Sequence, residues 1–185
     1  MNTPPPRYDP VMQAVHWATL LLVAATFAAI WIADSGWVGS YVRPIVQIHR
    51  SLGLTICALT ILRLGWRLRS RVPELPADVP KIQKMAARAN EGLIYLLLIA
   101  QPLVGLAYTN AYGLRANLFL LAQLPPIIEK DRETAALLGD VHRLVGYILL
   151  AAIGLHAAAA LFHHFIRRDA VLTAMLPARF CRSQR

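Results

Sequence analysis

The sequence predicts an all-α fold, an integral membrane four-helix bundle, and two observations carry this prediction. First, 57% of the 185 residues are hydrophobic and only 16% are charged, with a mean hydropathy of +0.47. Second, four apolar runs, each long enough for a helix to cross a hydrocarbon core of about 30 Å, alternate with polar segments. The length is that of one domain, so we expect a single membrane domain over residues 1–185.

The net charge of +9 would also suit a nucleic-acid-binding protein. The basic residues, however, border the apolar runs and do not form a stripe along a polar face. We therefore expect the lipid bilayer as the surrounding medium and no nucleic acid partner. Two cysteines, Cys57 and Cys181, indicate no disulfide framework.

The first helix is expected over residues 11–33, after a short Pro-rich lead, and it contains His16 near its start. A signal peptide is the alternative for an apolar run near an N-terminus. A membrane helix is favoured because the lead contains only one basic residue, Arg7, the run is long, and its histidine has possible partners further along the chain.

The other three helices are expected over residues 45–66, 91–108 and 140–166. The second begins near His49, whereas the third contains no histidine. A basic, Pro-rich linker joins these two helices, and residues 109–138 read as a long loop of mixed charge. Its apolar piece NLFLLAQLPPII is too short to span and is expected at the membrane interface.

Basic residues indicate the orientation in the membrane. With four spans, both termini and the 63–90 linker lie on one face, which carries Arg7, Arg63, Arg67, Arg69, Arg71, Lys81, Lys84, Arg88, Arg167, Arg168, Arg179, Arg182 and Arg185. The other face has fewer cations, partly balanced by acids. The positive-inside rule then predicts that both termini are cytoplasmic.

Histidines lie inside these apolar runs, where an ionisable side chain is costly and marks a functional site. His142 and His156 are fourteen residues apart on the fourth helix, which is about 21 Å along its axis and an offset of roughly 40° around it. His49 enters its helix from the same outer side as His142. Two imidazoles therefore lie at the outer depth and one at the inner depth.

The two outer histidines share the local pattern H-R-x-x-G, as His49, Arg50 and Gly53 and as His142, Arg143 and Gly146. A glycine four residues on leaves a bare helix face beside the histidine, against which a flat ring can lie. The arginines could hold carboxylates at the membrane edge. Two axial imidazoles, a bare face and cations for propionates are what a haem requires.

On the inner side, His16 could pair with His156, His163 or His164, since all three lie within about 60° of the face of His142. Depth favours His156, because His163 is about 31 Å from His142 along the helix. For His163 and His164 two interpretations stay open: an interfacial pair beside Arg167 and Arg168, or a proton supply to a nearby site.

One structural zinc would need four ligands at one depth, whereas these histidines form two pairs about 20 Å apart. Leaving all four unliganded within the membrane is also disfavoured. The sequence lacks the C-x-x-C-H motif of covalently attached haem. We therefore expect two b-type haems with bis-histidine ligation by His16, His49, His142 and His156.

Three segments, YDPVMQAVHWATLLLV, IVQIHRSLG and HRLVGYILLAAIGLHAAAALFHHF, resemble the bacterial cytochrome b561 family, which includes membrane superoxide:ubiquinone oxidoreductases. The resemblance covers nearly the whole chain. It implies a four-helix bundle with two b-type haems in the inner membrane, and its ligand positions match His16 with His156 and His49 with His142. The propionate role of Arg50 and Arg143 rests on geometry alone.

By this resemblance, the expected activity is oxidation of periplasmic superoxide with electrons passed to ubiquinone. The alternative is a cytochrome b subunit that anchors a periplasmic dehydrogenase or hydrogenase and delivers its electrons to quinone; a membrane protein without haem is a third, weaker option. Outer cations could steer an anion or could pair with outer acids: Arg43, Arg50, Arg115, Lys130, Arg132 and Arg143. Candidate quinone contacts are His163, His164, Arg63, Tyr108, Asn110 and Tyr147, and no catalytic residue is assigned.

Overall fold

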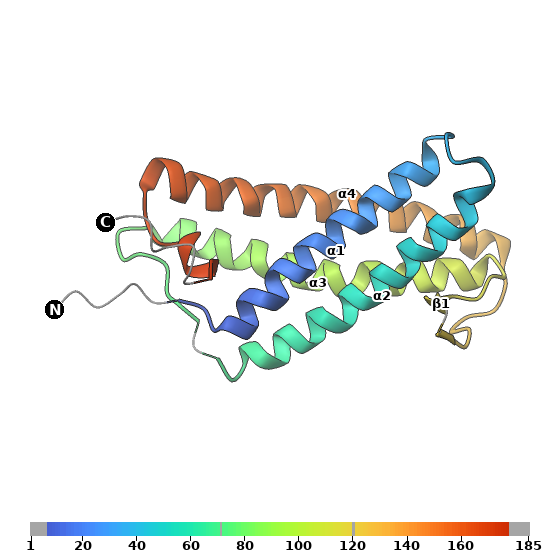
Figure 1. Cartoon of the computed structure of the whole chain (residues 1–185), viewed down its shortest axis with the longest axis horizontal. Helices are drawn as coiled ribbons and strands as arrows, with labels where there is room; N and C mark the ends of the chain where they lie inside the picture. Colours follow the sequence, from blue (N-terminus) through green and yellow to red (C-terminus); the bar gives the residue numbers. More distant parts are fainter. Residues whose placement is uncertain (1–6, 71, 120, 178–185) are drawn as a thin grey trace.

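The computed structural model describes residues 7–70, 72–119 and 121–177. Four long helices dominate it (Figure 1): α1 (Pro10–Asp34), α2 (Val42–Arg67), α3 (Lys81–Ala111) and α4 (Arg132–Phe162). Each is long and apolar enough to cross a membrane, which confirms the predicted fold class. Cys181 and four of the cations used to orient the chain, Arg71, Arg179, Arg182 and Arg185, lie outside the described residues.

Short elements complete the chain. A 3-10 turn, Gly39–Tyr41, precedes α2, and two antiparallel strands, β1 (Asn117–Leu118) and β2 (Ala122–Gln123), form a small hairpin between α3 and α4. After α4 the backbone widens into one π-helical turn, His163–Arg167, and a further 3-10 turn covers Thr173–Met175. The expected long loop at 109–138 is therefore shorter and partly ordered.

Two helices begin well before their apolar runs. α3 starts at Lys81, not near residue 91, and its first turns are KIQKMAARAN, whose Ala, Lys, Arg, Met and Gln residues are strong helix formers. α4 starts at Arg132, not near residue 140, because the Asp131 carboxylate accepts a hydrogen bond from the Thr134 N–H and caps the helix. Hydrophobicity locates the spanning part of a helix and not its polar extension.

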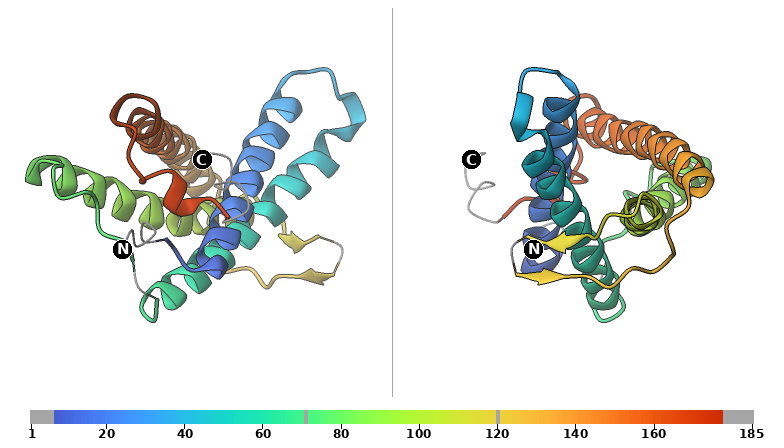
Figure 2. Two further views of the ribbon diagram at one scale, coloured as in Figure 1. Left: turned by 60° about the vertical axis from the view of Figure 1, so that its left-hand side comes forward. Right: turned by 90° about the vertical axis from the view of Figure 1, so that its right-hand side faces the viewer.

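The helices pack as two hairpins, α1 with α2 and α3 with α4, and α2 also packs against α3. Figure 2 shows the two hairpins crossing each other at an angle. The buried core cluster draws on all four helices, with Val23, Ile56, Leu97, Leu98 and Leu149. An apolar layer thus fills the middle of the bundle.

Most of the helical surface is apolar and exposed. Only 17% to 22% of the most apolar window of each helix is buried within the protein, and large side chains such as Leu21, Leu62 and Leu155 point outward. In water such a surface would be unfavourable, whereas lipid tails solvate it. The bundle is therefore that of a membrane protein.

Each end of the bundle is closed by its own segment. At one end, Ser51 of α2 holds the β1–β2 hairpin. Its hydroxyl donates a hydrogen bond to the Asn117 carbonyl and accepts one from the Phe119 N–H. At the other end, the chain after α4 returns to α1, where Gln13 donates to the Ala174 carbonyl and Trp17 donates to the Met175 carbonyl. The start of α1 and the end of α4 lie at this same end (Figure 1).

Candidate functional site

The structure contains two histidine pairs, and in each pair the two rings come from different helices and face each other. His49 of α2 and His142 of α4 have ring centres 6.2 Å apart, with their planes at 81°. His16 of α1 and His156 of α4 also have ring centres 6.2 Å apart, with their planes at 62°. The structure thus brings together the same partners that depth and the family resemblance suggested, and α4 contributes one histidine to each pair.

An apolar layer separates the two pairs. Val23, Ile56 and Leu149 lie seven residues from His16, His49 and His142 respectively, which is about two helical turns or 10 Å along each helix. Leu149 is also seven residues before His156. The pairs therefore lie at two depths, with the core cluster halfway between them.

The spacing within each pair suits a metal between the rings. Two imidazoles on opposite sides of one metal ion, each bound at about 2 Å through a nitrogen, have ring centres about 6 Å apart. The Nδ1 atoms of His16 and His142 are buried and have no hydrogen-bond partner among the described residues. Within that part of the chain, no third His, Cys or carboxylate joins either pair. A centre with two protein ligands is the arrangement of a bis-histidine haem, whose other four iron ligands come from the porphyrin.

His49 is oriented by a hydrogen bond. Its Nδ1 lies 2.9 Å from the Thr26 carbonyl oxygen, and because a carbonyl only accepts, Nδ1 carries the proton. Nε2 is then unprotonated and available to a metal, as in metal sites whose second imidazole nitrogen is held by a backbone carbonyl.

His142 is positioned by residues of α3, the helix without a histidine. The Gln101 side-chain amide donates to the His142 carbonyl at 2.8 Å. Gly105 leaves room for the imidazole, because a Cβ at this position would lie 2.8 Å from His142 Cε1. Sequence reasoning missed both residues, since they contact the ligand from a neighbouring helix and follow no motif with it.

In the H-R-x-x-G patterns, both glycines lie against α3, whereas the two arginines differ in exposure. A Cβ on Gly146 would lie 3.1 Å from the Gln101 amide nitrogen, and one on Gly53 would lie 3.8 Å from Pro102; α3 therefore lies beside both glycines. Arg143 is 70% exposed and forms a 2.7 Å ion pair with Asp140, which offers it a partner other than a propionate. Arg50 is half-buried. The cofactor-binding role of these four residues stays a prediction.

Charged residues of α2 and α3 lie on the inner side of the core cluster, as the inner pair does. Arg67 of α2 forms a two-pronged ion pair with Glu91 of α3, and the guanidinium carbons of Arg63 and Arg67 lie 5.4 and 5.8 Å from the centre of the Tyr95 ring. Of these residues, the sequence singled out Arg63 alone, as a candidate quinone contact. Glu91 and Tyr95 were missed because their partners come from another helix.

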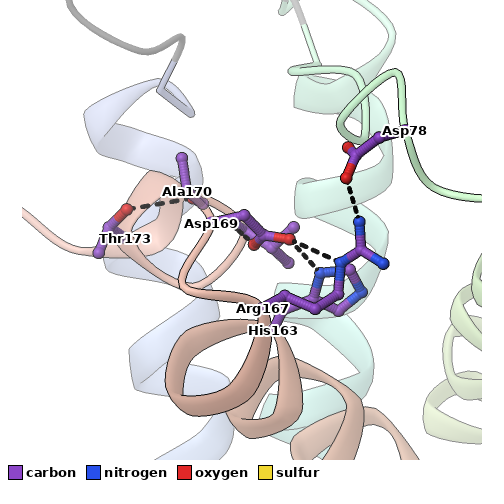
Figure 3. Close-up of polar contacts among 7 residues, drawn as sticks. Asp78, His163, Arg167, Asp169, Ala170 and Thr173 are labelled. Carbon is purple, nitrogen blue, oxygen red and sulfur yellow. Dashed lines mark hydrogen bonds and ion pairs between the residues drawn. The ribbon is translucent and has the colours of Figure 1, made fainter.

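His163 and His164 have different environments. His163 Nδ1 lies 2.6 Å from an Asp169 carboxylate oxygen, which Arg167 Nε also approaches at 3.4 Å. Arg167 further pairs with Asp78 of the α2–α3 linker (Figure 3). His164 instead packs edge-on against Phe165.

The pKa of Asp169 reflects this network. Burial by itself would raise this pKa, but hydrogen bonds from His163 and from the Val171 N–H outweigh burial and hold it below its usual range. The left-handed backbone of Arg168, with φ of 55°, turns the chain so that Asp169 reaches back to His163. This polar cluster closes the inner end of α4.

Four membrane helices with two imidazole pairs at two depths define a protein of the membrane electron-transfer class. The model of the prokaryotic cytochrome b561 family matches residues 7–178, and the chain belongs to this family. Membership confirms the resemblance seen in the sequence. It implies b-type haem and an electron-transfer role in a bacterial membrane.

Individual relatives match over nearly their full lengths. The chain is 34% identical over 179 residues to cytochrome b561 homolog 1 of Escherichia coli K12, covering 94% of this chain and 98% of that protein. It is 32% identical over 174 residues to the probable superoxide oxidase CybB of Yersinia pestis, covering 94% and 97%. Cytochrome b561 homolog 2 of E. coli K12 is 29% identical over 177 residues, covering 95% and 93%.

Proposed function

We propose that this protein is a dihaem membrane oxidoreductase that takes electrons from superoxide on the periplasmic side of the inner membrane and delivers them to ubiquinone. The two histidine pairs carry the proposal, because they lie at two depths of one bundle. Two redox centres stacked across a bilayer suit electron transfer between a donor on one side and an acceptor in the membrane.

His49 with His142, and His16 with His156, would each hold one haem b, which supplies reversible one-electron chemistry when bound. With two imidazoles for each haem, the protein would disfavour O₂ binding at the iron and favour electron transfer. The protein positions the pairs through α4 and excludes water through the core cluster. These are the contributions expected of the polypeptide in a cofactor enzyme.

The outer end suits an anionic donor. Arg43, Arg115 and Arg132 are exposed there beside a similar number of exposed acids, so the attraction of an anion such as superoxide would come from individual cations near the outer pair and not from the net charge of this face. The 32% identity to a probable superoxide oxidase supports the same donor. The basic residues of the opposite end support cytoplasmic termini.

The inner end suits proton uptake. Two superoxide anions released as two O₂ supply two electrons, and ubiquinone needs these and two protons to become ubiquinol. His163 Nδ1 lies 2.6 Å from an Asp169 carboxylate oxygen, and a hydrogen-bonded imidazole–carboxylate pair can pass a proton onward. We therefore place quinone reduction near this end, with the His163–Asp169 pair as a proton donor.

An optical redox titration of the purified protein, with haem quantitation, tests the proposal first. We expect two b-type haems per chain, reduced by a superoxide pulse and reoxidised by a soluble ubiquinone. Two haems that do not respond to superoxide would favour the anchoring subunit of a periplasmic dehydrogenase or hydrogenase. A protein without haem would contradict the proposal altogether.

A further inference from the structure

Helix α2 presents a cation at the depth of the inner histidine pair. Arg63 follows His49 by fourteen residues, the same spacing that separates His142 from His156 on α4. It therefore lies about 21 Å further along the helix and roughly 40° around it. The face of α2 that supplies a histidine to the outer pair supplies an arginine at the inner level.

Arg63 lies on the same side of the core cluster as the two inner histidines. It is seven residues beyond Ile56 of that cluster, as His16 and His156 are seven residues from Val23 and Leu149. Its guanidinium carbon is 5.4 Å from the centre of the Tyr95 ring, whose side chain is buried at 8% exposure. Arg63 Nε and the Tyr95 hydroxyl are both buried without a hydrogen-bond partner among the described residues. The buried space between α2 and α3 thus holds two potential donors without a partner.

Among the described residues, no Asp or Glu side chain forms an ion pair with Arg63. All ten Asp and Glu residues lie within the described ranges, and none of those carboxylates is within 4 Å of this guanidinium. The neighbouring Glu91 instead pairs with Arg67 through both of its oxygens. A partly buried cation within a membrane bundle is costly unless an anion accompanies it.

We propose that Arg63, assisted by the Tyr95 hydroxyl, binds a propionate of the haem held by His16 and His156. This inference rests on the proposed function only in requiring a haem at that pair. A propionate carries the negative charge that would neutralise the Arg63 cation. A guanidinium binds such a carboxylate through two parallel hydrogen bonds. A quinone carbonyl is uncharged and would leave the buried cation without a counter-ion.

The test compares Arg63→Gln with Arg63→Lys, Tyr95→Phe and a control, Arg69→Gln. Arg69 is an exposed cation just beyond the end of the same helix, so its loss removes the same charge without touching the inner pair. For each purified variant, three properties are measured: haems per chain, the two reduction potentials, and the propionate bending bands in the resonance Raman spectrum.

We expect Arg63→Gln to shift one reduction equilibrium at least tenfold toward the oxidised form, which is a fall of about 59 mV for one electron. The other potential stays fixed, and one propionate band moves. Arg63→Lys retains most of the potential but alters the band, because ammonium lacks the forked geometry. Tyr95→Phe gives a smaller change of the same sign, and Arg69→Gln matches the wild type.

Loss of one haem per chain in Arg63→Gln, with two retained in Arg69→Gln, would also support the inference. If Arg63→Gln does not fold, Arg63→Lys decides through its Raman band. If variants that retain two haems have unchanged potentials and Raman bands, the propionate inference is wrong. If their KM for ubiquinone is also raised, Arg63 contacts the quinone instead. A wild type without haem would instead contradict the proposed function.

Discussion

The outer and inner histidine pairs have the same ring separation, yet different groups position them. The groups that contact the outer rings are neutral: the Thr26 carbonyl orients His49, and Gln101 and Gly105 accommodate His142. The charges that act on His49, those of Arg50 and Asp34, have opposite signs. Around the inner pair the neighbours include Arg63, Arg67 and Glu91.

This comparison suggests how one fold can give two different redox centres. Nearby cations favour the reduced state of a centre, whereas neutral hydrogen bonds mainly fix ligand orientation. We therefore expect the inner haem to have the higher reduction potential. That order would make electron flow from the outer to the inner centre favourable, in the direction that the proposed function requires.

Removal of one ligand from each pair should have the largest effect. We expect His142→Ala to lose the outer haem and His156→Ala to lose the inner haem, because one imidazole would hold each group less tightly than two. Haem quantitation should then give one haem per chain in each variant, and the remaining potential should differ between them. Retention of two haems in either variant would contradict the ligand assignment.

The next largest effect is expected at Gly105. A Cβ there would lie 2.8 Å from His142 Cε1, so Gly105→Ala must displace the imidazole or the helix, and overpacking of this kind costs about 1–3 kcal/mol. We expect a shifted absorption band and potential for the outer haem and an unchanged inner haem.

Gly92 on the same helix provides the matched control for Gly105. Nothing lies within 4 Å of a Cβ at this position, so Gly92→Ala should leave both spectra intact and stabilise the helix by roughly 0.5–1 kcal/mol. Equal spectra for the two alanine variants would show that Gly105 does not accommodate His142.

A change at the outer hairpin is expected to have a smaller effect on the two haems, because it contacts neither histidine pair. Ser51 is fully buried, and Ser51→Ala leaves the Phe119 N–H without its acceptor, at a cost of about 1–3 kcal/mol. Hydrogen exchange of residues 117–119 should become faster, while exchange in residues 169–176 at the opposite end should not change. Uniformly faster exchange would indicate global destabilisation.

The smallest effect is a pH dependence at the inner end. Because the folded-state pKa of Asp169 lies below its usual range, its contribution to stability is complete above the ordinary Asp pKa of about 4 and is lost as the pH falls through the lowered value. The protection factors of the amides in residues 170–176, which compare the observed exchange with the intrinsic rate at the same pH, should therefore fall on acidification below about pH 4. In Asp169→Asn this acid-dependent step should be absent; its persistence would assign the step to another group.

Prediction from the sequence succeeded where one helix contains the whole signal. The spacing of His142 and His156 within α4 required no neighbouring element, and the four apolar runs identified the spans. It was less accurate at Lys81 and Arg132, where polar helical extensions precede the apolar runs. It also missed Gln101, Gly105, Glu91 and Tyr95, each of which acts on a residue of another helix.

The sequence by itself determined the four spans, their apolar surface, and two levels of histidine on α4, because helical periodicity and hydrophobicity are local properties of the chain. Only the tertiary structure decided which helix faces which. It set the 6.2 Å approach within each pair, the contact of Gln101 with His142, and the contact of Arg63 with Tyr95. Contacts between residues far apart in sequence depend on the angle at which the helices cross, and a local sequence pattern does not determine this crossing angle.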